Sequence, residues 1–182
     1  MLVVEVQMGE ELFDEEKSEF VFSEPPFRLR LQHSLVSLSK WEESFERPFL
    51  NNKEKTSDET VAYIKAMCID EEIPPEVFSK LSAENFADIQ AHITAKKTAT
   101  WFSETAGGKA SGEIITSELI YYWMIAFNIP SSYETWHLSR LLTLIRICQH
   151  KNTPAKKMSK AEIAQRQREL NAKRRAEMKT TG

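Results

Sequence analysis

The residues that could do chemistry in this 182-residue chain are its four histidines, its two cysteines and one glycine-rich segment. The histidines are His33, His92, His137 and His150. No H-E-x-x-H or C-x-x-C pattern surrounds them, although zinc sites in proteins use ligands at such short spacings. The sequence also lacks the G-x-S-x-G nucleophile elbow. We therefore predict no metal site, and we interpret Trp136–His137 as the start of a helix rather than as a catalytic pair.

The remaining reactive residues indicate structure rather than catalysis. The segment "GGKASG" (107–112) lacks the spacing of a phosphate-binding loop, so we interpret it as a flexible connection. Cys68 and Cys148 lie far apart in apolar surroundings, which predicts two buried thiols and a reducing compartment. These patterns predict no catalytic residue and no cofactor, and hence a protein that is not an enzyme.

Charge divides the chain into an acidic body and a basic tail. Residues 151–182 hold ten Lys or Arg against three Glu, a net charge of +7. The whole chain carries −3, so the first 150 residues carry −10. This split suits self-association, an acidic protein partner or nucleic acid. The tail has no aromatic side chain on which bases could stack, so nucleic acid stays an alternative that is not favoured.

The first 33 residues have the pattern of a small antiparallel β module. Residues 2–7 ("LVVEVQ") and 19–22 ("EFVF") are short strand candidates, and 27–32 ("FRLRLQ") alternates apolar and polar residues. Pro25 and Pro26 mark the turn before the last strand. The acidic segment 9–19 is expected to be a solvated loop.

From Ser34 onward the apolar residues recur at helical spacings. Thr56-x-x-Glu59 and Ser131-x-x-Glu134 have the form of capping boxes, as does Ser159-x-x-Glu162 in the tail. A strip of Leu138, Leu141, Leu142, Ile145 and Cys148 predicts one buried helix face. The predicted helices cover 36–46, a segment starting at Thr56, 74–81, 82–93, 117–127, 134–150 and 159–178.

The aromatic stretch 114–148 is interpreted as core. Its longest uncharged apolar run, "LIYYWMIAF", is about half of what a bilayer requires, so we expect no membrane association. The short loop around Pro130 predicts that its two helices pack as a hairpin whose seam holds the aromatic side chains. The predicted fold class is α+β, mostly α: a β module (1–33), a helical domain (34–150) and a basic, exposed C-terminal helix (151–182).

Four phrases of the sequence resemble a family of small proteins from tailed bacteriophages. They are "LQHSLVSLSKWEESFERPFL", "TATWF", "EIITSELIYYWMIAFNIPSSYETWHLSRLLTLIRIC" and "KKMSKAEIAQRQRELNAKRR". The family is that of the tail assembly chaperones, encoded among the tail genes before the tape measure protein. The resemblance extends from about His33 over most of the chain, and the phrases contain no catalytic motif.

The resemblance implies a non-enzymatic protein that binds the tape measure protein until tail-tube subunits replace it, in the host cytoplasm and with self-association. The alternative is a structural virion protein of the neck or tail, with nucleic acid as a further contact of the basic tail. The residues expected to bind partners are Trp136, Leu138, Leu141, Leu142, Arg166, Arg168, Arg174 and Arg175.

Overall fold

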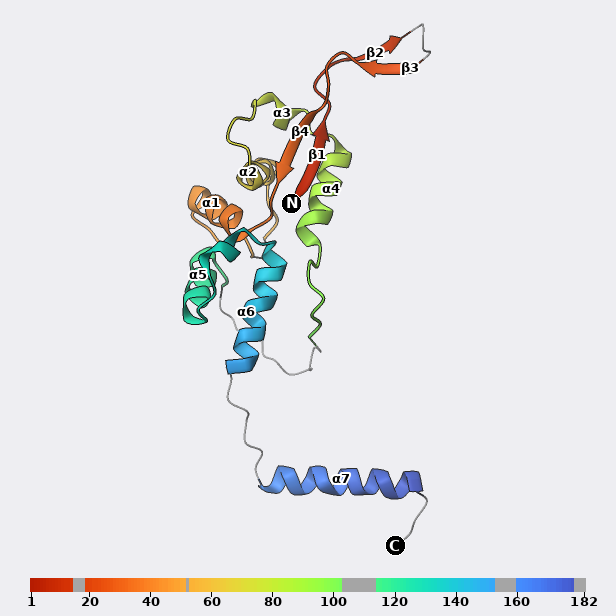
Figure 1. The fold of residues 1–182 in the computed structure, drawn as a ribbon, viewed down its shortest axis with the longest axis vertical. Coiled ribbons are helices and arrows are strands. Elements are labelled where there is room, and N and C mark those ends of the chain that lie inside the picture. The colour runs from red at the N-terminus through yellow and green to blue at the C-terminus, as the bar shows by residue number, and fades with distance from the viewer. Residues whose placement is uncertain (15–18, 52, 103–113, 153–159, 179–182) are drawn as a thin grey trace. The chain divides into compact units, whose positions relative to one another are not determined.

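The computed structural model describes residues 1–14, 19–51, 53–102, 114–152 and 160–178 (Figure 1). It divides into two compact units, Met1–Cys148 and Gln149–Gly182, which are described separately. Helices predominate, and the strands form two small antiparallel sheets. The predicted class, α+β and mostly α, is confirmed.

Strands β1 (Leu2–Val6) and β4 (Phe27–Leu31) pair antiparallel, with Leu2 opposite Leu31 and Val6 opposite Phe27. Apolar and polar residues alternate along β4, as the sequence predicts. Val4, Val6, Leu29 and Leu31 face the core, while the residues between them are exposed. Helix α4 (Ala83–Thr94) packs along β1, so these strands and the helices share one core rather than forming separate modules.

Strands β2 (Glu11–Asp14) and β3 (Glu19–Phe22) form a second two-stranded sheet. The expectation that 9–19 is only a solvated loop is therefore wrong. Leu12 and Phe13 lie opposite Val21 and Phe20, and these apolar cross-strand pairs favour pairing within an acidic sequence. At Gly9, an added Cβ would lie 2.4 Å from the Glu24 backbone nitrogen, so the crossing between the two sheets requires glycine.

The N-cap residues of helices α1 (Leu35–Phe45), α2 (Ser57–Met67) and α4 are Ser34, Thr56 and Ser82. Each of these three residues takes part in a capping box, which the sequence predicts for Thr56. A single turn, α3 (Glu76–Ser79), follows Pro74 and Pro75. The chain therefore starts its helices where side-chain oxygens satisfy the otherwise unpaired N–H groups of the first turn.

Helix α5 (Ser117–Ala126) confirms the predicted helix, but the next element differs from the prediction. Residues Ser131–Thr135 form the 3-10 helix η1 without a side-chain cap, and α6 (Leu138–Asn152) begins only afterwards. The amide of Leu138 donates to the His33 carbonyl oxygen, and the His137 carbonyl accepts from Leu141, so the new helix starts from a tertiary contact. The capping box expected at Ser131 is therefore not formed.

The aromatic stretch contributes less to the core than predicted. Its buried apolar side chains are Ile120, Met124, Leu138, Leu141 and Ile145. Tyr122 is 63% exposed, and the other tyrosines and tryptophans of the stretch are half-buried. Helix α5 packs chiefly on α1 rather than forming a closed seam with α6. The buried aromatic cluster consists instead of Trp41, Phe49 and Tyr63. The rings of Phe49 and Tyr63 are stacked, with 3.9 Å between their centres.

The second unit contains helix α7 (Lys160–Met178). Every side chain described over 164–175 is exposed, in agreement with the expected exposed basic helix. Its predicted capping residue, Ser159, lies outside the described residues. Among the helices that the structure describes, none combines the length and apolar character needed to cross a bilayer. Cys68 and Cys148, predicted to be buried, are both half-buried free thiols.

Candidate protein-binding groove

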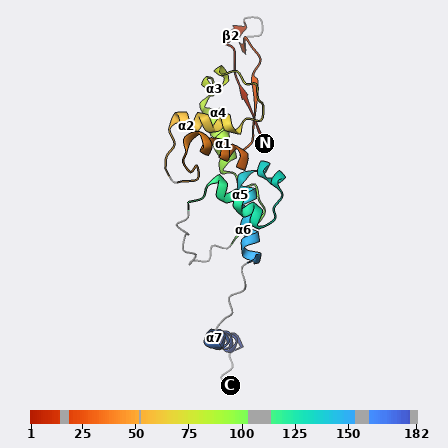
Figure 2. The same cartoon turned by 90° about the vertical axis from the view of Figure 1, so that its left-hand side faces the viewer.

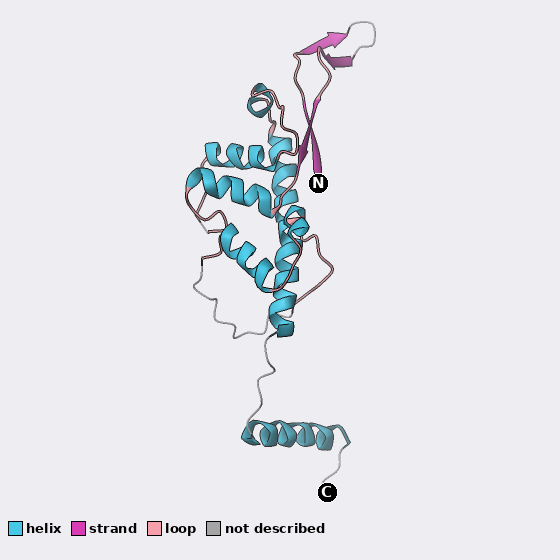
Figure 3. Cartoon of the chain, turned by 60° about the vertical axis from the view of Figure 1, so that its left-hand side comes forward, coloured by secondary structure: helices cyan, strands magenta, loops and turns pink. Residues whose placement is uncertain are grey.

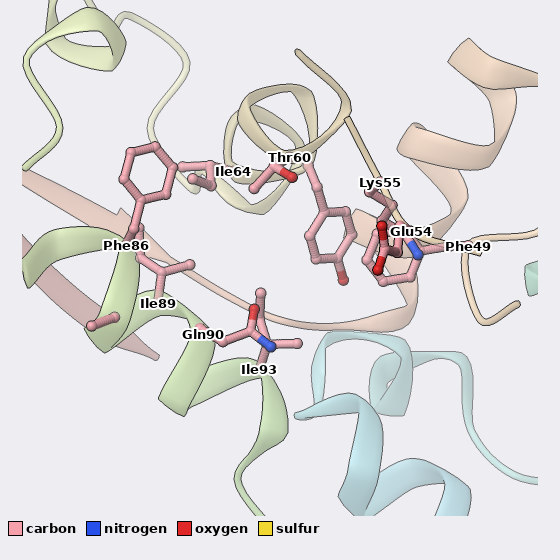
Figure 4. Close-up of a pocket in the computed structure, with 11 residues that line it drawn as sticks. Phe49, Glu54, Lys55, Thr60, Ile64, Phe86, Ile89, Gln90 and Ile93 are labelled. Carbon is pink, nitrogen blue, oxygen red and sulfur yellow. The ribbon is translucent and has the colours of Figure 1, made fainter. Parts of the chain in front are cut away.

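An apolar groove lies between helices α2 and α4 (Figure 4). Its volume is about 660 Å3. Figure 4 shows Phe86, Ile89, Gln90 and Ile93 reaching into it from α4 and Ile64 from α2. Glu54, Lys55 and Phe49 close the end nearest the loop between α1 and α2 (the α1–α2 loop). Figure 2 shows the same body from the side, with α1, α2 and α4 close together.

The floor of the groove is the core of the body itself. Ile64 and Ile89 are only 1% and 2% exposed, while Phe86 and Ile93 on the walls are half-buried. Phe86, Ile89 and Ile93 recur at spacings of three and four along α4, so one helical strip supplies both floor and wall. A groove with a fixed floor keeps its shape without a ligand, and its walls still have apolar surface to cover.

A lysine held against an aromatic ring forms the polar end of the groove. Lys55 Nζ lies 4.4 Å from the centre of the Phe49 ring, which is a cation–π distance. Burial, together with the nearby Arg47 cation, lowers the pKa of Lys55. Arg47 also pairs with Glu59, whose pKa is lowered chiefly by the hydrogen bond from the Thr56 amide. This end of the groove therefore presents the Lys55 cation, with the Glu54 carboxylate next to it, beside apolar surface.

Three of the four histidines, distant in sequence, meet in the first unit, where His33 contacts Tyr63 of the groove lining. The His137 ring lies 5.0 Å from that of His33 and 5.1 Å from that of His92, measured between ring centres. His33 Nδ1 is 2.6 Å from the buried Tyr63 hydroxyl. Burial lowers the pKa of His33 to about 3 and that of His92 to about 4. The cluster is therefore neutral near pH 7.

The histidine cluster joins structural elements rather than presenting ligand atoms. His137 Nε2 is 2.9 Å from the His92 carbonyl oxygen, and its Nδ1 is 2.9 Å from Ser139 Oγ. Both ring nitrogens of His137 are thus engaged within the protein. No group of three His, Cys, Asp or Glu side chains within the described ranges is placed to hold a metal ion.

The residues expected from the sequence to bind partners do not line this groove. Leu138 and Leu141 are 2% and 0% exposed, so the expectation that they contact a partner is corrected: they are core residues. Leu142 is half-buried. Trp136 is half-buried as well. Its ring is stacked on that of Tyr133, with 4.0 Å between ring centres, and the guanidinium carbon of Arg140 lies 3.9 Å from the centre of the Trp136 ring. An apolar strip on one helix cannot reveal by itself which of its members the rest of the fold covers.

The four arginines of the prediction lie on α7, in the other unit. Arg166, Arg168, Arg174 and Arg175 are all exposed, as expected. The groove was not predicted, because it forms between two helices whose apolar strips each have the pattern of an ordinary core-facing helix. The sequence shows that Phe86, Ile89 and Ile93 share one face of α4, but only the structure shows that Ile89 alone among the three is buried.

Comparison with known proteins adds no relative: no protein-family model, no curated protein and no solved structure matches this chain.

Proposed function

We propose that this protein is a non-enzymatic tail assembly chaperone of a tailed bacteriophage, which binds the tape measure protein and gives way to tail-tube subunits. The observation that carries the proposal is the preformed apolar groove between α2 and α4. The resemblance of the four sequence phrases from about His33 onward supplies the identity of the client. The expected location is the host cytoplasm during infection.

The groove has the chemistry of a receptor for an amphipathic helix. Ile64, Phe86, Ile89 and Ile93 form an apolar trough between two helices, and Lys55 stands at one end. A client helix with apolar residues at i, i+3 and i+7 would cover the trough. An acidic residue at its end would meet Lys55. A long helical tape measure protein has many such faces to keep from aggregating, and moderate contacts allow later displacement.

The groove does not have the arrangement that catalysis requires. Of the residues that line it, only Glu54, Lys55 and Tyr63 have ionisable side chains. Burial raises the pKa of Tyr63, and its hydroxyl is turned toward His33 rather than held as a proton donor for a ligand. A nucleophile beside a general base is absent from this lining. These features support a binding role.

The proposal is tested by co-expressing the protein with the tape measure protein of the same phage. We expect the full-length chain to raise the soluble fraction of the tape measure protein and to be retained with it in a pull-down. Ile93→Glu places a charge on the groove wall and should abolish both effects. Tyr122→Ser changes an exposed aromatic residue on α5 and is the matched control. Unchanged solubility and retention with the Ile93 variant would contradict the proposal.

A structural virion protein of the neck or tail is the second candidate. The exposed basic helix α7 favours it, because clustered Arg and Lys suit contact with nucleic acid or with an acidic virion surface. Mass spectrometry of purified particles separates the two functions. A chaperone is absent from mature virions, whereas a structural protein is present at a fixed copy number.

A further inference from the structure

The β2–β3 hairpin carries an exposed aromatic face. Alternation along the strands places Phe13 of β2 on the same face as its partner Phe20 and as Phe22 of β3. Their side chains are 54%, 67% and 43% exposed, and the rings of Phe13 and Phe20 are in edge contact at 5.2 Å. A two-stranded sheet of this size is marginally stable alone in water. Exposed apolar surface of this kind marks a contact site.

The charge of the hairpin limits what can cover that face. Residues 9–24 contain seven acidic residues and one lysine, a net charge of −6. Glu11 lies opposite Phe22 and therefore on the aromatic face itself. Two hairpins would repel each other, so face-to-face pairing of hairpins is disfavoured. The complementary surface must be basic and must also offer some apolar side chains.

Helix α7 has both properties. Leu170, Arg174 and Met178 recur every four residues and so form one strip on the helix. Leu170 and Met178 are 48% and 74% exposed, and Arg174 is exposed between them. The tail that contains α7 carries +7. An isolated helix with so little apolar surface has little tertiary support.

We propose that the aromatic face of the β2–β3 hairpin binds the Leu170–Arg174–Met178 strip of α7 from a second copy of this chain. Arg174 lies over a phenylalanine ring and near Glu11, and Leu170 and Met178 cover the other rings. Within the Met1–Cys148 unit, the hairpin and the C-terminal part of α6 lie at opposite ends (Figures 1 and 3). A second copy can therefore offer α7 without the chain returning along its own first unit.

The contact has a consequence for assembly because it uses two different surfaces. Each copy has one hairpin and one α7, so two copies can exchange their α7 helices reciprocally, or each copy can bind two different neighbours. Reciprocal exchange closes a two-fold dimer, whereas binding to successive neighbours produces rings or open chains. An extended series of copies matches the need of a protein that covers a long client, although the contact itself does not require the client.

The test is sedimentation velocity of the purified full-length chain in the absence of any client. At about 0.1 M salt we expect species larger than a monomer, which dissociate toward 0.5 M salt as the charges are screened. Arg174→Glu and Phe20→Ser should each raise the dissociation constant about tenfold or more. Lys173→Glu reverses another exposed positive charge of α7, outside the Leu170–Arg174–Met178 strip, and Tyr122→Ser removes an aromatic side chain elsewhere. Both should have a much smaller effect.

A charge exchange provides the decisive variant. Glu11→Arg alone should weaken assembly as Arg174→Glu does, and the double variant should restore it. Cross-linking of a mixture of two differently tagged copies should join the hairpin of one tag to α7 of the other. The proposal would be overturned by a protein that stays monomeric, by an assembly that does not respond to salt, or by equal effects of the Arg174 and Lys173 variants. It would also be overturned if the charge exchange fails or if the cross-links form only within one copy. Because Ile93 lies outside this contact, client binding through the groove can fail or succeed independently.

Discussion

The Glu42 side chain accepts a hydrogen bond from the Ser117 backbone amide, with 2.7 Å between Oε2 and N. Its other oxygen accepts from the Phe49 amide at 2.8 Å. One carboxylate on α1 therefore satisfies the first turn of α5, 75 residues away, and also fixes the α1–α2 loop. Glu42 is only 7% exposed, so the negative charge meets the N-terminal end of α5 away from bulk water.

Replacing Glu42 should destabilise the whole body. Glu42→Ala leaves two N–H groups without a partner at a site from which water is largely excluded, and we expect a loss of about 2–4 kcal/mol in the free energy of unfolding. Urea denaturation followed by circular dichroism measures it. Glu43→Ala changes an exposed neighbour and should cost less than about 0.5 kcal/mol. Equal losses for the two variants would show that the bridge does not hold α5.

Leu141→Ala tests the core face of α6. Leu141 is 0% exposed, so the truncation creates a cavity and should cost about 2–5 kcal/mol in the free energy of unfolding. Ile125→Ala removes a side chain that is 76% exposed and serves as the control. An unfolding curve of the Leu141 variant that matches the wild type would mean that another face of α6 is buried.

Acid should destabilise the protein through the histidine cluster. The folded-state pKa values of His33 and His92, about 3 and 4, lie below the ordinary value of 6.5, because burial and the neighbouring histidines disfavour the charged rings. The unfolded chain therefore binds more protons than the folded chain once the pH falls below about 6.5. Stability is full above that pH and is lost as the pH falls toward 4. We expect the melting temperature to fall by at least about 5 °C between pH 7 and pH 5.

A variant assigns this acid sensitivity. His92 is 8% exposed, and its Nε2 has no hydrogen-bond partner within the described residues. His92→Phe should keep the ring contact with His137 and remove one titrating group. The melting temperature of this variant at pH 7 should stay near the wild-type value, and its fall between pH 7 and pH 5 should be smaller. An identical pH profile would locate the acid sensitivity elsewhere.

Truncation after Thr153 should leave the first unit folded. The unit Met1–Cys148 is compact by itself, and the described side chains of α7 are exposed. We expect the melting temperature of the truncated chain to agree with that of the full chain within about 2 °C when both are measured at 0.5 M salt. Loss of the cooperative transition would mean that the tail belongs to the core. At low salt the truncated chain should also no longer assemble, because it lacks Arg174.

Local patterns were sufficient wherever one element decides the outcome. The alternation of Phe27, Leu29 and Leu31 predicted β4 and its buried face. The Thr56 capping box predicted where α2 starts. The spacing of Leu138, Leu141 and Ile145 predicted the buried side of α6. In each case the helical or strand period determines which side chains share a face, and the spacing of apolar residues in the sequence shows that period.

Contacts between distant segments decided the rest. At Ser131 the sequence has the form of a capping box, but the His33 carbonyl accepts from Leu138, and α6 begins there instead. His33, His92 and His137 are 45 or more residues apart, so no spacing could indicate that their rings would meet. The groove forms only where α2 and α4, which are separate in sequence, both contribute side chains to one lining. The sequence by itself determined the helices, the strands and their apolar faces, because those depend on neighbours along the chain. Which faces are covered, and which stay open to a partner, was decided by tertiary packing, because burial depends on what the rest of the chain places opposite.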